Sequence, residues 1–154
     1  MPAEINVLIV DDHGIVRQGL RAYLDLIEDI SIVGEAENGI DAIEKVKQFT
    51  PDIVLMDLVM PEMDGIEATH QIREWEEKNI VQSSKLKGKE IFDLSTYKKR
   101  VPIVALTASA IKGDMEKCLE SGMDDYITKP INKKIFFEVI EKWISGKQSI
   151  QNSI

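Results

Sequence analysis

Short runs of β-branched and other apolar residues alternate along the chain with longer stretches in which apolar and polar positions are mixed. Each short run spans only a few residues and is bounded by polar or turn-forming residues, which is the pattern of a buried strand. Five strands are predicted in this way, at residues 5–10, 30–33, 53–56, 101–106 and 126–128.

Between the predicted strands, apolar residues recur every three or four positions, which is the period of an amphipathic helix. Asn38 and Asn132 stand at N-cap positions, while Gly122 and Gly146 follow a last helical turn. Because right-handed crossovers put helices on both faces of a parallel sheet, the alternation predicts an α/β fold with an open, doubly wound sheet. The helical signals lie at residues 16–27, 40–49, 66–75, 115–119 and 135–143.

One connection is longer than this alternation requires. About 50 positions separate the ends of the third and fourth predicted strands, whereas a βαβ unit needs roughly 30 residues. The extra residues fall around 76–100, where we expect a lengthened third helix, a basic loop at 83–89 and a short ordered turn. An unstructured surface insertion is the alternative. We expect one domain over residues 1–146 and a polar tail at 147–154.

Composition and charge exclude several classes of function. The 154 residues are 44% apolar, which suffices for one hydrophobic core. A net charge of −8 disfavours direct contact with nucleic acid or an anionic membrane surface. Cys118, the only cysteine, cannot form an internal disulfide, and neither it nor His13 and His70 has zinc-ligand spacing. With no signal peptide pattern and no apolar stretch near the roughly 20 residues of a spanning helix, we expect a cytoplasmic protein without membrane insertion.

Polar groups of complementary chemistry follow four of the predicted strands. Asp11 and Asp12 follow the first strand, Asp57 the third, Thr107 the fourth and Lys129 the fifth. In open α/β sheets the ligand crevice lies beyond these carboxyl ends, so we expect the groups to meet there. Three neighbouring carboxylates repel one another unless a cation neutralises them, and Mg²⁺ is the simplest such cation. The set contains the parts for phosphoryl transfer to a carboxylate.

The same residues lie within longer motifs that resemble the receiver domain of two-component (phosphorelay) response regulators. The resemblance runs over about residues 5–144. It implies a flavodoxin-like (βα)₅ fold, a single domain whose five parallel strands take the order 2-1-3-4-5. The motifs are VLIVDD at 7–12, PDIVLMD at 51–57, MPEMDG at 60–65, PIVALTA at 102–108 and GMDDYITKP at 122–130.

By this resemblance, Asp57 is the phosphoacceptor, and its donor is a phosphohistidine on a histidine kinase or a histidine phosphotransfer protein. Asp11, Asp12, Asp57 and the backbone carbonyl of Val59 are the expected ligands of Mg²⁺, with Mn²⁺ as a substitute. His13 is expected to start a helix instead of binding metal. The paired methionines of the MPEMDG motif are expected to serve packing.

The resemblance also implies a switch. Thr107 and Lys129 would bind phosphoryl oxygens, and the peptide bond between Lys129 and Pro130 is expected to be cis. Tyr126 resembles the family's switch aromatic, which moves inward as the hydroxyl of Thr107 approaches the phosphoryl group. The surface of the fourth helix, fifth strand and fifth helix would then change to control an output partner or a phosphorylation-dependent homodimer. A half-buried strand aromatic is the alternative for Tyr126.

Two other functions remain alternatives at this point. Haloacid-dehalogenase-like phosphatases use similar groups around Mg²⁺. Their nucleophile ends the first strand, and they need a second acid two positions later. In this chain the residue two positions after Asp11 is His13. A pseudo-receiver that binds without being phosphorylated is the second alternative. We expect no turnover enzyme, but a chain that catalyses its own Mg²⁺-dependent phosphorylation and dephosphorylation. Residues 12–20 resemble receivers attached to helix-turn-helix domains, whereas 107–110 and 118–123 resemble receivers fused to sensor kinases.

Overall fold

The computed structural model describes residues 4–86, 100–108 and 111–152. Strands and helices alternate along these residues, and all five strands pair in parallel in the order β2-β1-β3-β4-β5. The predicted fold class and strand order are confirmed. The elements are β1 (Ile5–Val10), α1 (Gly14–Leu24), β2 (Ile30–Ala36), α2 (Gly39–Phe49), β3 (Ile53–Asp57), α3 (Gly65–Leu86), β4 (Ile103–Thr107), α4 (Lys112–Glu120), β5 (Asp125–Thr128) and α5 (Lys133–Asn152).

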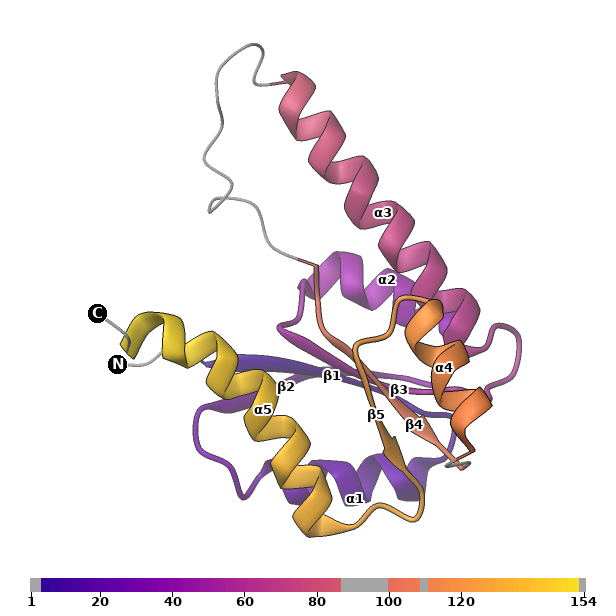
Figure 1. Ribbon diagram of the computed structural model, residues 1–154, viewed down its shortest axis with the longest axis vertical. Coiled ribbons are helices and arrows are strands. Elements are labelled where there is room, and N and C mark those ends of the chain that lie inside the picture. Colours follow the sequence, from indigo (N-terminus) through magenta and orange to yellow (C-terminus); the bar gives the residue numbers. More distant parts are fainter. Residues whose placement is uncertain (1–3, 87–99, 109–110, 153–154) are drawn as a thin grey trace.

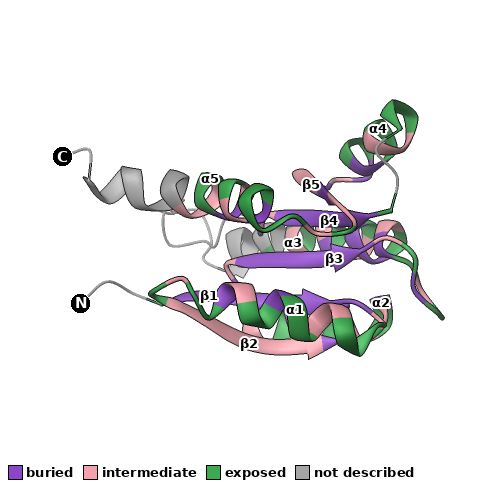
Figure 2. Ribbon diagram, turned by 90° about the horizontal axis from the view of Figure 1, so that it is seen from below, coloured by how far each residue is buried: buried purple, intermediate pink, exposed green. Residues whose placement is uncertain are grey.

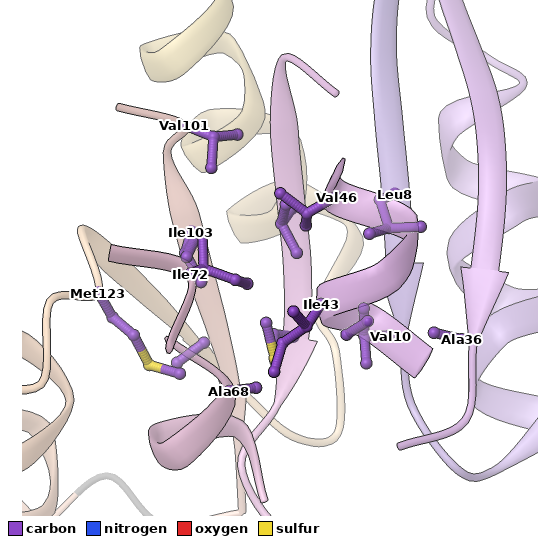
Figure 3. Packing of buried hydrophobic residues seen from close by; sticks show 14 of the residues in the cluster. Leu8, Val10, Ala36, Ile43, Val46, Ala68, Ile72, Val101, Ile103 and Met123 are labelled. Atoms are coloured by element: carbon purple, nitrogen blue, oxygen red, sulfur yellow. The ribbon is translucent and has the colours of Figure 1, made fainter. Parts of the chain in front are cut away.

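Helices cover both faces of the sheet (Figure 1). Successive side chains of a strand point to opposite faces, and along β1 the side chains of Leu8 and Val10 join the core under α2, α3 and α4, whereas Val7 and Ile9 join the core under α1 and α5. Figure 3 shows the first of these cores, where side chains of α2 and α3 pack over the central strands. The central strands β3 and β4 are buried along their whole length, and the edge strand β2 is mostly half-buried (Figure 2).

Local capping fixes three helix ends where the sequence predicts them. The side chain of Asn38 accepts a hydrogen bond from the N–H of Asp41 at 2.8 Å, and Asn132 accepts one at the start of α5. Gly122 follows α4 with a φ of 108°, which is favourable only for glycine. The predicted end at Gly146 is wrong, because α5 continues to Asn152. A single glycine costs a helix only about 1 kcal/mol and does not by itself end it.

The lengthened third helix is confirmed, since α3 comprises 22 residues and ends at Leu86. Residues 83–86, predicted as loop, are therefore helical. The remainder of the expected loop and the ordered turn, residues 87–99, lie outside the described residues. Across the part of the chain that the structure describes, neither α3 nor any other helix combines the length and the hydropathy that a membrane crossing needs.

Candidate functional site

The carboxyl ends of four parallel strands form one rim of the sheet. Asp57 and Thr107 are the last residues of β3 and β4, and Lys129 directly follows β5. Together with Asp12, which lies just after β1, they line a cavity of about 750 Å³. Asp11 lies next to this cavity and is completely buried. The structure thus brings the five polar residues that were expected at the strand ends to the same rim.

Two of these carboxylates share one ammonium group. The Nζ atom of Lys129 lies 3.0 Å from Oδ2 of Asp11 and 3.2 Å from Oδ1 of Asp57. Burial raises the pKa of Asp57, and the nearby charge of Asp11 raises it further, against the opposing effect of Lys129. Burial on its own would lower the pKa of Lys129, but Asp11 and Asp57 raise it overall. Asp11 and Asp57 therefore carry more negative charge than Lys129 alone offsets.

Asp12 and His13 complete the cluster of possible metal ligands. One buried carboxylate oxygen of Asp12, Oδ1, has no hydrogen-bond partner. Four side chains each offer one possible ligand atom, and these atoms lie within 4.8 Å of one another: Asp11, Asp12, His13 and Asp57. Carboxylate oxygens are the ligands that hard divalent cations prefer, and a cation would satisfy the unpaired oxygen. The residues present therefore fit a divalent cation.

The side chain of His13 makes contacts that the sequence does not predict. It occupies the N-cap position of α1, as expected, but its side chain makes no capping hydrogen bond there. The ring instead turns back toward the carboxylates of Asp11 and Asp12. The only sequence signal for this contact is that His13 directly follows Asp12. Asp114 and Lys117 of α4, which also line the cavity, were likewise not among the predicted site residues.

The loop after β3 shapes one wall of the cavity. Val59 is 80% exposed at this wall, while Met60 is buried and Met63 packs against the core, which confirms that the methionines serve packing. Gly65 begins α3, and its N–H donates to the carbonyl of Leu58 at 2.9 Å. A Cβ atom at Gly65 would lie only 2.3 Å from the carbonyl oxygen of Asp57, so a side chain at this position would displace the loop.

The β5 end of the site agrees with one expectation. The peptide bond between Lys129 and Pro130 is cis, and the N–H of Lys129 donates to the carbonyl of Thr107 at 2.7 Å. Tyr126 is half-buried and packs against the core under α2, α3 and α4. Ser109, two positions beyond Thr107 as Val59 is beyond Asp57, lies outside the described residues.

The raised pKa of Asp57 predicts that Asp57→Asn stabilises the metal-free fold near pH 7. The folded state holds the Asp57 proton more tightly than the unfolded chain, so its stability falls as the pH rises from the unfolded pKa near 3.8 through the folded value. Asparagine removes that penalty. In urea unfolding with EDTA, the variant should have the higher midpoint at pH 7, and the difference should vanish toward pH 3.

The substitution Glu116→Gln, at an exposed position of α4, serves as the control. We expect its urea midpoint to differ from that of the wild type by the same amount at pH 7 and at pH 3. Saturating Mg²⁺ should reverse the order by stabilising the wild type alone. A metal-free Asp57→Asn protein that unfolds at a lower urea concentration than wild type at pH 7 would contradict the assigned electrostatics.

The chain is similar to known proteins along nearly its whole length. The family model described as "Response regulator receiver domain" matches residues 7–90. The response regulator protein VraR of Staphylococcus saprophyticus is 38% identical over 150 residues, which cover 97% of this chain. The chain spans only 61% of the length of that relative.

Solved structures agree with this match. The receiver domain of the Saccharomyces cerevisiae response regulator Ssk1, in a co-crystal with the histidine phosphotransfer protein Ypd1, has a TM-score of 0.77 at 36% identity, covering 93% of this chain and 90% of that chain. The receiver domain of the Pseudomonas aeruginosa sensor histidine kinase PA1611, with a magnesium ion coordinated in its active site cleft, has a TM-score of 0.69 at 29% identity, covering 93% of this chain and 99% of that one.

Proposed function

The chain belongs to the response regulator receiver domains of two-component signalling, and from this premise we propose that Asp57 accepts a phosphoryl group from a phosphohistidine on a partner protein. The donor is a histidine kinase or a histidine phosphotransfer protein, as in the Ssk1–Ypd1 co-crystal. One observation carries this proposal: Asp57, only 5% exposed, lies beside Asp11 and Lys129 on a cavity at the carboxyl end of the sheet.

The groups around Asp57 meet the chemical needs of the transfer. A carboxylate oxygen of Asp57 attacks phosphorus to form an O–P bond, and the P–N bond to the donor imidazole breaks as that ring takes up a proton. The ammonium of Lys129 lies 3.2 Å from the Asp57 carboxylate and is placed to pair with a phosphoryl oxygen. The hydroxyl of Thr107, on the neighbouring strand, would bind another.

Asp11, Asp12, Asp57 and the backbone carbonyl of Val59 are the groups that would hold Mg²⁺, or Mn²⁺ in its place. When bound, the ion neutralises charge on the phosphoryl oxygens. The buried oxygen of Asp12 that accepts no hydrogen bond supports this assignment, because a cation would satisfy it.

Phosphorylation would act on the surface of α4, β5 and α5. A new dianion at Asp57 draws the hydroxyl of Thr107 toward it, and the side chain of Tyr126 moves into the vacated space. Ala105, on the same strand as Thr107, pairs in register with Tyr126 on β5. The two switch residues therefore lie on neighbouring, paired strands. The changed surface would control an output partner or a homodimer.

The output lies with a partner and not with direct nucleic-acid contact by this chain. The net charge of −8 supports this, because it repels a phosphate backbone. A cytoplasmic location is part of the same proposal, since histidine kinases present their phosphoryl group there.

Incubation with Mg²⁺ and a small acyl phosphate, followed by intact mass measurement, tests the proposed function. The wild type should gain the mass of one phosphoryl group, and Asp57→Asn should gain none. Glu116→Gln is the control and should react as the wild type does. Continuous phosphate release that depends on Asp11 would instead indicate a phosphatase, and no adduct on any variant would indicate a pseudo-receiver.

The Val59→Asn substitution is expected to shorten the lifetime of the acyl phosphate. The apolar side chain of Val59 lines the cavity and cannot orient an attacking water, whereas an amide can. Decay of the phosphorylated protein, measured by intact mass after removal of the phosphate donor, should be faster in the variant. Equal or slower decay would contradict this role, and Val59→Ala controls for loss of bulk.

A further inference from the structure

The imidazole of His13 is positioned at the proposed cation site as closely as a ligand would be. Its Nδ1 atom lies 3.1 Å from Oδ1 of Asp11 and 3.1 Å from Oδ1 of Asp12. The side chain is 64% exposed and makes no capping bond to α1. The ring therefore does not cap the helix, and its Nδ1 atom instead lies within hydrogen-bond distance of the Asp11 carboxylate.

The separations match those between neighbouring ligands of a single ion. With metal–ligand distances of about 2.1 Å, two adjacent corners of an octahedron lie about 3.0 Å apart. Both distances from Nδ1 have this length. The backbone N–H of His13 also donates to Oδ1 of Asp11 at 2.8 Å, which fixes the carboxylate against the ring. Oδ1 of Asp12 accepts no hydrogen bond, and the same nitrogen is the polar atom placed beside it.

We propose that Nδ1 of His13 is a ligand of the divalent ion alongside Asp11 and Asp12, and that it shifts the selectivity of the site toward borderline transition metals such as Co²⁺ and Ni²⁺. The inference rests on the proposed function only in that it uses the same cation site. Imidazole nitrogen favours such ions, whereas Mg²⁺ prefers oxygen ligands. Ligation requires the neutral ring with its proton on Nε2.

Calorimetric titration of the full chain with Co²⁺ alone and with Mg²⁺ alone tests this inference. The substitution His13→Asn should weaken Co²⁺ binding by about tenfold or more and change Mg²⁺ binding by less than about twofold. The matched control is His70→Asn, because His70 is the other histidine and lies exposed on α3 away from the carboxylates. It should leave both affinities unchanged.

A second readout uses the wild type and does not depend on the folding of a variant. In the proton NMR spectrum with Co²⁺, ligation by Nδ1 should give a strongly shifted, exchangeable Nε2–H signal of His13. The absence of such a signal, or unchanged Co²⁺ affinity in His13→Asn, would overturn the inference. Equal weakening of Co²⁺ and Mg²⁺ would overturn it too, because that result indicates an effect on charge or packing.

The proposed function and the ligand role of His13 can fail independently of each other. If the wild type takes a phosphoryl group on Asp57 with Mg²⁺ while His13 proves indifferent to Co²⁺, only the inference fails. If Asp57 takes none while His13→Asn still loses Co²⁺ selectively, the metal assignment stands and the phosphoacceptor assignment fails.

Discussion

The Lys129→Met substitution is expected to slow phosphorylation of Asp57 by a small acyl phosphate about 10²–10³-fold. The ammonium lies 3.0 Å from the Asp11 carboxylate and 3.2 Å from that of Asp57, so it is placed where charge on the transferred group must be neutralised. Methionine keeps much of the length and apolar contact of the lysine stem but supplies no donor. The rate of adduct formation at saturating Mg²⁺, followed by intact mass, measures the effect.

The matched control for this substitution is Lys117→Met. Lys117 also lines the cavity, but it is exposed and lies on α4. Its loss should change the rate by no more than a few fold, as expected for a surface charge. If both variants were equally slow, the loss of any positive charge near the cavity, and not the position of Lys129, would explain the effect. An unimpaired Lys129→Met protein would remove the proposed role.

The Gly65→Ala substitution should destabilise the fold by about 1–3 kcal/mol through overpacking. The new methyl group would lie 2.3 Å from the carbonyl oxygen of Asp57 and 3.1 Å from Cγ of Met56, and a backbone oxygen cannot rotate away. Because the loop must shift, the acceptor carboxylate should move with it and phosphorylation should slow. Urea unfolding and the adduct assay together measure both consequences.

Gly19→Ala is the opposite case and serves as the control. Gly19 lies inside α1, and nothing lies within 4 Å of a Cβ atom built there. Alanine should therefore stabilise the protein by about 0.5–1 kcal/mol through its helix propensity, with phosphorylation unchanged. A Gly65→Ala protein as stable as wild type would show that the loop after β3 adapts without cost.

The sequence predicts the framework of this protein well because the framework follows from periodic burial. The strands β3 and β4 are apolar up to their last residues, Asp57 and Thr107, and they are the fully buried ones. The meeting of Asp11 with Lys129 follows from topology alone, since parallel strands align their carboxyl ends. Element ends are less predictable: β2 runs past Gly34 to Ala36, because pairing with β1 continues beyond the apolar run.

Side-chain direction at the site could not be predicted, because it depends on neighbours that only the folded chain supplies. The sequence predicts only that His13 starts a helix. The direction of its ring, toward Asp11 and Asp12, depends on the folded positions of those carboxylates. The need for glycine at position 65 likewise appears only once the carbonyl of Asp57 is in place next to it. The end of α5 was mispredicted because Gly146 alone does not terminate a helix.

The contact between Lys129 and Asp11 joins residues 118 positions apart. A chain emerging from the ribosome therefore carries its acids long before their ammonium partner exists, and β5 must dock before the cluster is complete. Contacts of such long range form late, after the local helices. The proposed phosphoacceptor site therefore requires β5, and we expect copies truncated before Lys129 not to take up a phosphoryl group.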